Sequence, residues 1–348
     1  MIAIHFDDRG HSFSKRWIEY CNTHNIPYKL VNCYSSDILE QISDCDGLMW
    51  HWYQGDIVAL SFAIQLTTAI EMMGKKVFPN SNTGSHFDDK ISQGYLFAAL
   101  GVPMVPSYVF YEQQEAEKWI RTTTYPKVFK LKGGASSVNV KLVRDAAGAF
   151  KLMRTAFGKG FPSYDRTALF KDSLLRAKRN PGINTLLDAA KAFARIFIRT
   201  DLEKNSPRER GYLYFQEFIP DNQYDTRLVV IGNRCFGLRR YNRENDFRAS
   251  GSGKFDYAKE LFDPRCISLA FEVSDKLGAQ SMAYDFIMDK GNNPLIVEMS
   301  YCFSIPAYDH CPGYWDKHLV WHEGNFNAQH FMVEDFYNSI NKSSGANQ

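Results

Sequence analysis

Two strongly apolar segments near the C-terminal end of the chain each carry one acidic residue. They span 281–289 (SMAYDFIMD) and 294–300 (PLIVEMS), and a Lys-Gly-Asn-Asn turn joins them. This pattern predicts two neighbouring strands that carry Asp285 and Glu298. A charged carboxylate inside an apolar strand is costly unless it has a partner. Because Mg²⁺ binds one or two carboxylates together with phosphate oxygens, the pair indicates a divalent-cation site, the alternative being two acids that face solvent.

Strands and helices alternate through the first 85 residues. Apolar segments at 2–6, 27–32, 46–52 and 76–79 predict strands, while 14–25 and 56–73 predict helices. This alternation is typical of an open parallel sheet in an α/β fold. His51 and Trp52 end the third strand, where open α/β sheets usually place ligand contacts, so both are candidates for substrate contact.

Composition excludes several classes of protein. The 348 residues are 45% hydrophobic and 23% charged, which predicts a soluble globular chain of two or three packed subdomains. A net charge of +2 gives no general argument for a nucleic-acid or membrane partner. Seven cysteines without a CxxC pair, and a start unlike a signal peptide, indicate free thiols and a cytoplasmic location. A zinc site around Cys302, His310 and Cys311 is an alternative whose spacing fits no standard pattern.

A glycine–serine turn lies between two further strand segments, 126–131 and 138–143. It contains Gly133, Gly134, Ser136 and Ser137, and Lys130 ends the first strand. Backbone N–H groups of a glycine-rich turn can bind phosphate oxygens, because no side chain blocks the approach. The motif is neither a Walker A loop nor a dinucleotide fingerprint, and a plain hairpin is the alternative.

Five arginines occur within 22 positions of the strand-rich part of the chain: Arg227, Arg239, Arg240, Arg243 and Arg248. Guanidinium groups bind phosphates and carboxylates in bidentate geometry. Alternation along a strand sends Arg239 and Arg240 to opposite faces, so at most one of them enters a shared site. A surface ion pair is the better explanation for Arg243.

Residues 155–210 differ from the rest of the chain. Between positions 158 and 210 there are twelve Lys and Arg against six Asp and Glu. Helical spacing relates the apolar residues Leu186, Leu187, Ala190, Phe193, Ala194 and Phe197. The segment is either a groove for an anionic substrate or a helical insertion whose charges face water, and we favour the insertion.

The order of these features resembles the ATP-grasp superfamily, and within it the ribosomal-protein glutamate ligases and related carboxylate–amine ligases. The resemblance covers roughly residues 75–305 and is most specific in 238–253 (LRRYNRENDFRASGSG) and 86–107 (HFDDKISQGYLFAALGVPMVPS). It implies an ATP-grasp domain at 86–305, with a lid near 105–150 and the insertion near 155–210. A small parallel-sheet α/β domain at 1–85 would precede this domain, and a C-terminal extension at 306–348 would follow it.

The resemblance also implies a role for each matching residue. Those that would bind ATP are Lys90, Lys130, Gly133, Gly134, Ser136, Ser137, Gln216, Glu217, Phe218, Ile219 and Asp225. Arg227, Arg240 and Arg248 would contact the substrate and the γ-phosphate. Asp285, Glu298 and Ser300 match the positions that hold Mg²⁺, with Mn²⁺ as an alternative. The family usually has Asn in place of Ser300, and a hydroxyl is a shorter and weaker ligand than an amide oxygen.

The implied activity is ATP-dependent carboxylate–amine ligation through an acyl phosphate, with release of ADP and phosphate. An amino acid, a peptide or a sugar acid is the expected substrate, with no nucleic-acid or membrane partner. Relatives are commonly dimers or tetramers, so a homo-oligomer is also an expectation. The alternatives are phosphoryl transfer to a hydroxyl, favoured by the basic insertion, and nucleotide binding without turnover, motivated by Ser300. The segment 308–324 is either a wall of the acceptor site or a packed extension, and we favour the extension.

Overall fold

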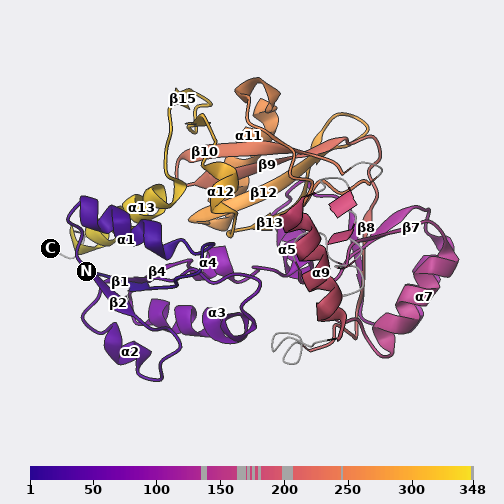
Figure 1. Ribbon diagram of the computed structural model, residues 1–348, viewed down its shortest axis with the longest axis horizontal. Helices are drawn as coiled ribbons and strands as arrows, with labels where there is room; N and C mark the ends of the chain where they lie inside the picture. Colours follow the sequence, from indigo (N-terminus) through magenta and orange to yellow (C-terminus); the bar gives the residue numbers. More distant parts are fainter. Residues whose placement is uncertain are drawn as a thin grey trace. The chain divides into compact units, whose positions relative to one another are not determined.

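The computed structural model describes residues 1–134, 139–162, 170, 173–174, 177–178, 182–197, 207–243 and 246–345. Two compact units make up the chain, and Figure 1 shows their helices and strands. Unit 1 comprises Met1–Phe87, Leu96–Met104 and Asp221–Gln348, while unit 2 comprises Asp88–Tyr95 and Val105–Pro220. The helix α5 (Lys90–Ala99) contributes residues to both units. Every helix in the described ranges is too short or too polar to cross a membrane.

Unit 1 begins with a four-stranded parallel sheet, which confirms the α/β prediction for the start of the chain. Its order is β2 (Tyr28–Val31), β1 (Ile2–His5), β3 (Gly47–Met49) and β4 (Lys76–Phe78). The connecting helices are α1 (Ser14–Thr23), α2 (Ile38–Gln41) and α3 (Ile57–Met72), and α4 (Ser81–Gly84) follows the last strand. The C-terminal helix α13 (Ala328–Gly345) packs beside α1 (Figure 1).

A seven-stranded sheet forms the rest of unit 1. Its order is β13 (Pro294–Ser300), β12 (Ser281–Met288), β9 (Tyr224–Ile231), β10 (Arg234–Tyr241), β14 (Gly313–Trp315) and β15 (Trp321–Glu323), with β11 (Phe255–Asp256) beside β10. The pairs β9–β10, β9–β12 and β12–β13 are antiparallel. The segment 308–324 continues this sheet at β14 and β15, after the short helix α12 (Ile305–Tyr308).

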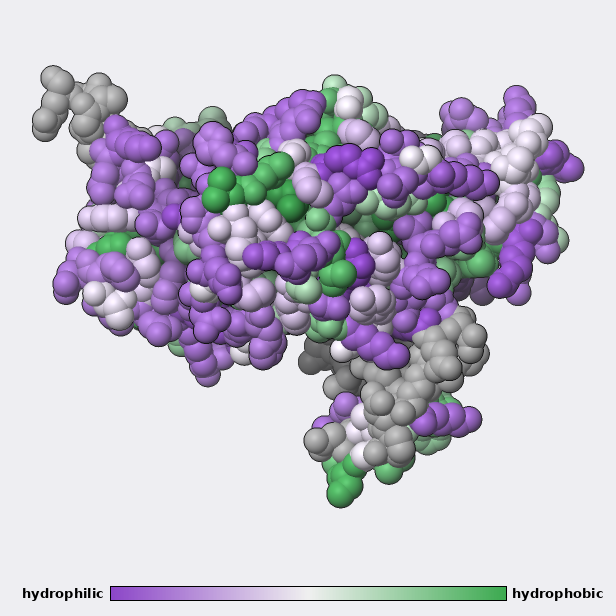
Figure 2. Space-filling model, turned by 90° about the horizontal axis from the view of Figure 1, so that it is seen from above, coloured by the Kyte–Doolittle hydropathy of each residue, from purple (hydrophilic) through white to green (hydrophobic). Residues whose placement is uncertain are grey.

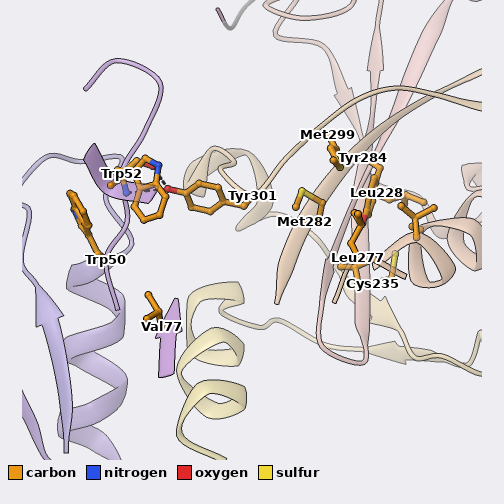
Figure 3. Packing of buried hydrophobic residues seen from close by; sticks show 14 of the residues in the cluster. Trp50, Trp52, Val77, Leu228, Cys235, Leu277, Met282, Tyr284, Met299 and Tyr301 are labelled. Atoms are coloured by element: carbon orange, nitrogen blue, oxygen red, sulfur yellow. Dashed lines mark hydrogen bonds between the residues drawn. The ribbon is translucent and has the colours of Figure 1, made fainter. Parts of the chain in front are cut away.

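Strand alternation divides the core of unit 1 between the two faces of the seven-stranded sheet. Leu228 and Tyr284 pack on the face covered by α11 (Pro264–Leu277), next to the 3-10 turn η1 (Lys259–Leu261). Val229 and Phe236 pack on the other face with residues of α12 and α13. Figure 3 shows part of the first cluster, in which Tyr301 reaches Trp52 of the parallel-sheet region.

Unit 2 contains a four-stranded sheet of order β5 (Ser107–Phe110), β8 (Leu213–Glu217), β6 (Lys127–Phe129) and β7 (Lys141–Val143). The antiparallel β6–β7 pair confirms the predicted hairpin. The helices α6 (Gln113–Thr122) and α7 (Ala146–Phe157) enclose a core that includes Phe129 and Phe215, and α9 (Ile183–Phe197) lies in the inserted segment. The sheet is completed by β8, which lies far along the chain from its neighbours.

Candidate functional site

The two acidic strands of the sequence form the predicted hairpin in unit 1. Asp285 on β12 lies directly opposite Glu298 on β13, and a bulge follows, because Phe286 pairs with Ile296. Asp285 is only 5% exposed. The alternative that both acids face solvent is therefore wrong for Asp285, and the sheet brings the two carboxylate-bearing residues side by side.

Two arginines from neighbouring strands contact the buried Asp285. Arg240 on β10 donates from Nε and Nη2 to the two oxygens of Asp225 at 2.7 and 2.8 Å, and its Nη2 also lies 2.7 Å from Asp285 Oδ2. Arg227 lies opposite Asp285 on β9, with Nε 3.5 Å from Oδ1. Asp225, Arg227, Arg240 and Asp285 form the carboxylate–arginine cluster. The resemblance assigned Arg227 and Arg240 to the substrate and the γ-phosphate, Asp225 to ATP and Asp285 to the metal.

The charges in the carboxylate–arginine cluster balance, and Glu298 adds a negative charge beside it. Burial raises the pKa of Asp225, while the guanidinium of Arg240 opposes this shift. Asp285 Oδ1 is buried and has no hydrogen-bond partner within the described part of the chain. Arg227 Nε lies 3.5 Å from this oxygen as an ion pair without a hydrogen bond. A buried carboxylate next to a second acid still suits a hard divalent cation, whose remaining ligands are typically phosphate oxygens and water.

The other three arginines, Arg239, Arg243 and Arg248, lie outside the carboxylate–arginine cluster. Strand alternation predicts this for Arg239. Arg239 points to the other face, where its guanidinium lies 3.7 Å from the ring centre of Tyr224. Arg248 pairs with Asp246 in the loop after β10, with Nη2 2.7 Å from Oδ2. Arg243 donates from its Nε and Nη2 to the backbone oxygen of Ser250. It thereby closes the loop that carries Arg248.

Ser300, the third predicted metal residue, takes part in a turn at the end of β13. Its hydroxyl donates to the carbonyl oxygen of Cys302 at 2.9 Å and accepts from the N–H of Cys302 at 3.1 Å. Among the described residues, no three His, Cys, Asp or Glu side chains are grouped so that they could hold a metal ion. This also gives no support to the zinc alternative around Cys302, His310 and Cys311.

Tyr308, the first residue of the segment 308–324, ends α12 near the carboxylate–arginine cluster. The residue is 4% exposed, and its hydroxyl is buried without a hydrogen-bond partner in the described ranges. Burial raises the pKa of Tyr308, while the charges of Arg227 and Arg240 lower it, so their field reaches the hydroxyl. Arg227 Nε is also buried without a hydrogen-bond partner among these residues. Arg227 Nε already faces Asp285 Oδ1 at 3.5 Å, whereas the Tyr308 hydroxyl is a buried donor without a hydrogen bond among these residues.

Replacing Tyr308 with phenylalanine is expected to stabilise the protein by about 1 kcal/mol, because the change removes a buried polar group that has lost its hydration. Denaturant unfolding measures this. Tyr257→Phe is the matched control, because the Tyr257 hydroxyl donates to Ala307 O at 2.8 Å and its loss is expected to destabilise by about 1 kcal/mol. Equal destabilisation by both changes would mean that the Tyr308 hydroxyl has a partner.

His51 and Trp52 lie in the interior, contrary to the expectation that they contact substrate. They are 2% and 1% exposed. His51 Nδ1 accepts from the N–H of Phe13 at 3.3 Å, and its Nε2 lies 3.1 Å from Cys302 Sγ. The Tyr301 hydroxyl accepts from the N–H of Trp52 at 3.1 Å and donates to its carbonyl oxygen (Figure 3). These contacts fix the end of β3 to the segment that follows Ser300.

Acidification is expected to destabilise unit 1 through His51. Burial lowers the pKa of His51 to about 3 in the folded chain, against about 6.5 when unfolded. Between these values the unfolded state binds the extra proton, so stability falls as the pH decreases below 6.5, by about 1.4 kcal/mol per pH unit from this group. His51→Asn should lower the pH slope of the unfolding free energy by one proton, whereas substitution of the exposed His310 should not. An unchanged slope in His51→Asn would contradict this account.

The glycine turn and both predicted lysines belong to unit 2. Lys90, the first residue of α5, donates from Nζ to Gly134 O at 2.9 Å, and Gly134 N–H donates to Asp88 Oδ1 at 2.9 Å. Gly134 has φ +104°, which disfavours a side chain. Asp88 was missed, although it stands two residues before Lys90. Ser136 and Ser137 lie outside the described residues.

The strand β8, which runs between β5 and β6, carries Gln216 and Glu217 of the predicted ATP-binding residues. Gln216 accepts from Lys130 Nζ at 2.6 Å through Oε1, and both residues are buried. Glu217 accepts from Lys127 Nζ at 2.7 Å, an ion pair that the sequence did not reveal. Phe218 and Ile219 follow the strand. Unit 2 thus holds Lys90, Lys130, the two glycines and 216–219, while unit 1 holds Asp225, Arg227, Arg240, Arg248, Asp285, Glu298 and Ser300.

No known family model matches the sequence, and no curated protein matches it. Solved structures do resemble the chain along nearly its whole length. A RimK domain protein ATP-grasp from Sphaerobacter thermophilus DSM 20745 has a TM-score of 0.55 at 16% identity, covering 97% of this chain and 99% of that chain. The D-cycloserine synthetase DcsG has a TM-score of 0.58 at 12% identity, with the same coverage of 97% and 99%.

A D-alanine–D-alanine ligase from Bacillus anthracis, solved in complex with ATP, is also similar. Its TM-score is 0.52 at 12% identity, and the alignment covers 98% of both chains. At identities this low, structural similarity establishes the architecture alone, and this architecture agrees with the resemblance found in the sequence. The chain therefore has the ATP-grasp fold.

Proposed function

We propose that this chain is an ATP-dependent carboxylate–amine ligase that forms an amide through an acyl phosphate. The observation that carries the proposal is the pairing of Asp285 with Glu298 beside Arg227 and Arg240 on one sheet of an ATP-grasp fold. Ligation needs acids for a cation and guanidinium groups for a carboxylate or a transferring phosphoryl group.

The nucleotide would be bound by residues of unit 2. Lys90 and Lys130 would neutralise phosphate charge, and the backbone at Gly133 and Gly134 would approach the phosphate oxygens. Asp285 and Glu298 would hold Mg²⁺, or Mn²⁺ in its place, and the ion would neutralise charge on the phosphates. The peptide groups of 216–219 would face the adenine.

The chemistry is substitution at phosphorus followed by substitution at carbon. A carboxylate oxygen of the substrate bonds to the γ-phosphorus of ATP while the bond to the β-phosphate oxygen breaks, giving an acyl phosphate and ADP. The amine nitrogen then bonds to the acyl carbon, loses a proton, and inorganic phosphate leaves. Arg227 and Arg240 would orient the carboxylate and stabilise charge in the transition states.

A screen of carboxylate and amine pairs tests this proposal. Purified protein with Mg-ATP is incubated with amino acids, peptides and sugar acids, and ADP, phosphate and condensed products are measured by mass spectrometry. At least one pair is expected to yield equal amounts of ADP, phosphate and amide. Absence of ADP release with every pair would contradict the proposal.

The turn formed by Ser300 favours a second candidate, a nucleotide-binding protein without turnover. The Ser300 hydroxyl is already bonded to the backbone of Cys302, so it is less available to a metal than the usual amide would be. Tight ATP binding without any ADP formation would support this candidate. A phosphotransferase that acts on a hydroxyl is distinguished by a γ-phosphate that remains on the product.

A further inference from the structure

The helix α9 directs its apolar residues toward solvent. Ile183, Leu186 and Leu187 follow the i, i+3, i+4 spacing of one helix face and are 79%, 60% and 50% exposed. Ala189, at the side of this face, is buried. Helical spacing of apolar residues normally marks the face that packs against a core, so the arrangement in α9 is the reverse of the usual one.

The exposed face continues along the helix and is larger than a single side chain. Ala190 and Ala194 are exposed on it, and Phe193 is 51% exposed with its ring centre 5.4 Å from that of Phe170. Figure 2 shows a surface that is mostly hydrophilic, with hydrophobic residues in small groups. Contiguous exposed apolar side chains on a soluble protein usually mark an interaction surface.

The segment around α9 carries the positive charge of the chain. Positions 158–210 contain twelve basic and six acidic residues, a net charge of +6, whereas the whole chain has +2 and the remainder therefore −4. Lys178 and Lys191 are among the exposed residues. The net charge of the whole chain is close to zero because the acidic remainder offsets this basic segment. The net charge alone therefore gave no reason to expect an anionic partner.

Charge and apolar exposure together identify the class of partner. A second copy of the chain would bring one segment of +6 against another, which opposes pairing through this face. An anionic bilayer offers hydrocarbon to the leucines and isoleucine and negative headgroups to exposed lysines such as Lys178 and Lys191. We propose that α9 docks the protein on the surface of an anionic lipid membrane. At fifteen residues the helix is too short to span a bilayer, so it would lie in the interface.

Vesicle flotation with the full chain tests the proposal. Vesicles contain either phosphatidylcholine alone or about 30% phosphatidylglycerol, which supplies the anionic surface. Wild-type protein is expected to float with the anionic vesicles and not to bind the neutral ones. It should dissociate from the anionic vesicles at about 1 M salt, where charges are screened. Leu186→Glu combined with Leu187→Glu should reduce the bound fraction roughly tenfold or more.

A matched control makes the same chemical change on another helix. Val58 and Met72 of α3 are 59% and 84% exposed, so Val58→Glu with Met72→Glu should leave vesicle binding unchanged. No binding by wild-type protein to anionic vesicles, or equal binding by the α9 variant, would overturn the proposal. So would light scattering that shows a wild-type dimer, dissociated by the α9 changes, without vesicle binding. These outcomes are independent of ADP formation and therefore of the proposed ligase activity.

Discussion

Replacing Glu298 with glutamine is expected to reduce ADP formation by roughly 10³-fold. The change keeps the size of the side chain and its ability to accept a hydrogen bond, but it removes the negative charge opposite Asp285. A divalent cation at this hairpin would lose one of its two carboxylates, and charge on the transferring phosphoryl group would be less well neutralised. Steady-state ADP release at saturating ATP measures the effect.

A control separates loss of the cation site from a general effect of charge. Glu323→Gln removes an exposed carboxylate from β15 of the same unit and should leave ADP formation within about twofold, as expected for a surface change. If the substitution lowers the affinity for the cation, excess Mg²⁺ or Mn²⁺ should partly restore ADP formation by Glu298→Gln. Near wild-type ADP formation by Glu298→Gln would contradict a role for Glu298 in holding the cation.

Replacing Arg240 with methionine is expected to lower the free energy of unfolding by about 3–5 kcal/mol. The guanidinium bonds both oxygens of Asp225 and also contacts Asp285, so its loss leaves the buried Asp285 and the partly buried Asp225 without their shared cation. Denaturant unfolding with a fixed dependence on denaturant concentration measures the change. Arg240→Lys keeps the charge but not the planar fork and should lie between wild type and methionine.

The control for this change is an exposed ion pair of similar geometry. Arg265 donates to Asp263 at 2.6 Å, with its side chain 50% exposed. Because exposed pairs contribute little, Arg265→Met should cost less than about 1 kcal/mol. Similar losses from the two substitutions would show that burial of the carboxylate–arginine cluster is not what makes Arg240 important.

The elements that the sequence predicted correctly depend on local patterns. The hairpin of Asp285 and Glu298 follows from two apolar strands and a turn within twenty residues, and the parallel sheet follows from regular alternation of strands and helices. The opposite orientations of Arg239 and Arg240 follow from strand geometry alone. The periodicity of the sequence is therefore sufficient to predict strands, hairpins and side-chain orientation wherever residues close in the sequence determine them.

The features that the sequence did not predict depend on contacts between distant residues. Arg240 and Asp285 lie on strands that pair with opposite edges of β9. They come into contact because Arg240 pairs with Asp225 of β9 and Asp285 pairs with Arg227, two residues further along that strand. Tyr308 ends the short helix α12 after β13, where no spacing in the sequence indicates that it lies beside the arginines. The pattern in α9 predicted a helix correctly, but periodicity does not state whether the apolar face will be covered, and here it is exposed.

The measurement that tests the central claim most directly follows a labelled oxygen atom of the carboxylate substrate. If the carboxylate attacks the γ-phosphorus of ATP, one of its oxygens leaves with that phosphorus when the amine forms the amide. Mass spectrometry of the released inorganic phosphate should therefore find one labelled oxygen for each amide formed. Unlabelled phosphate, or a γ-phosphate that remains on the product, would contradict ligation through an acyl phosphate.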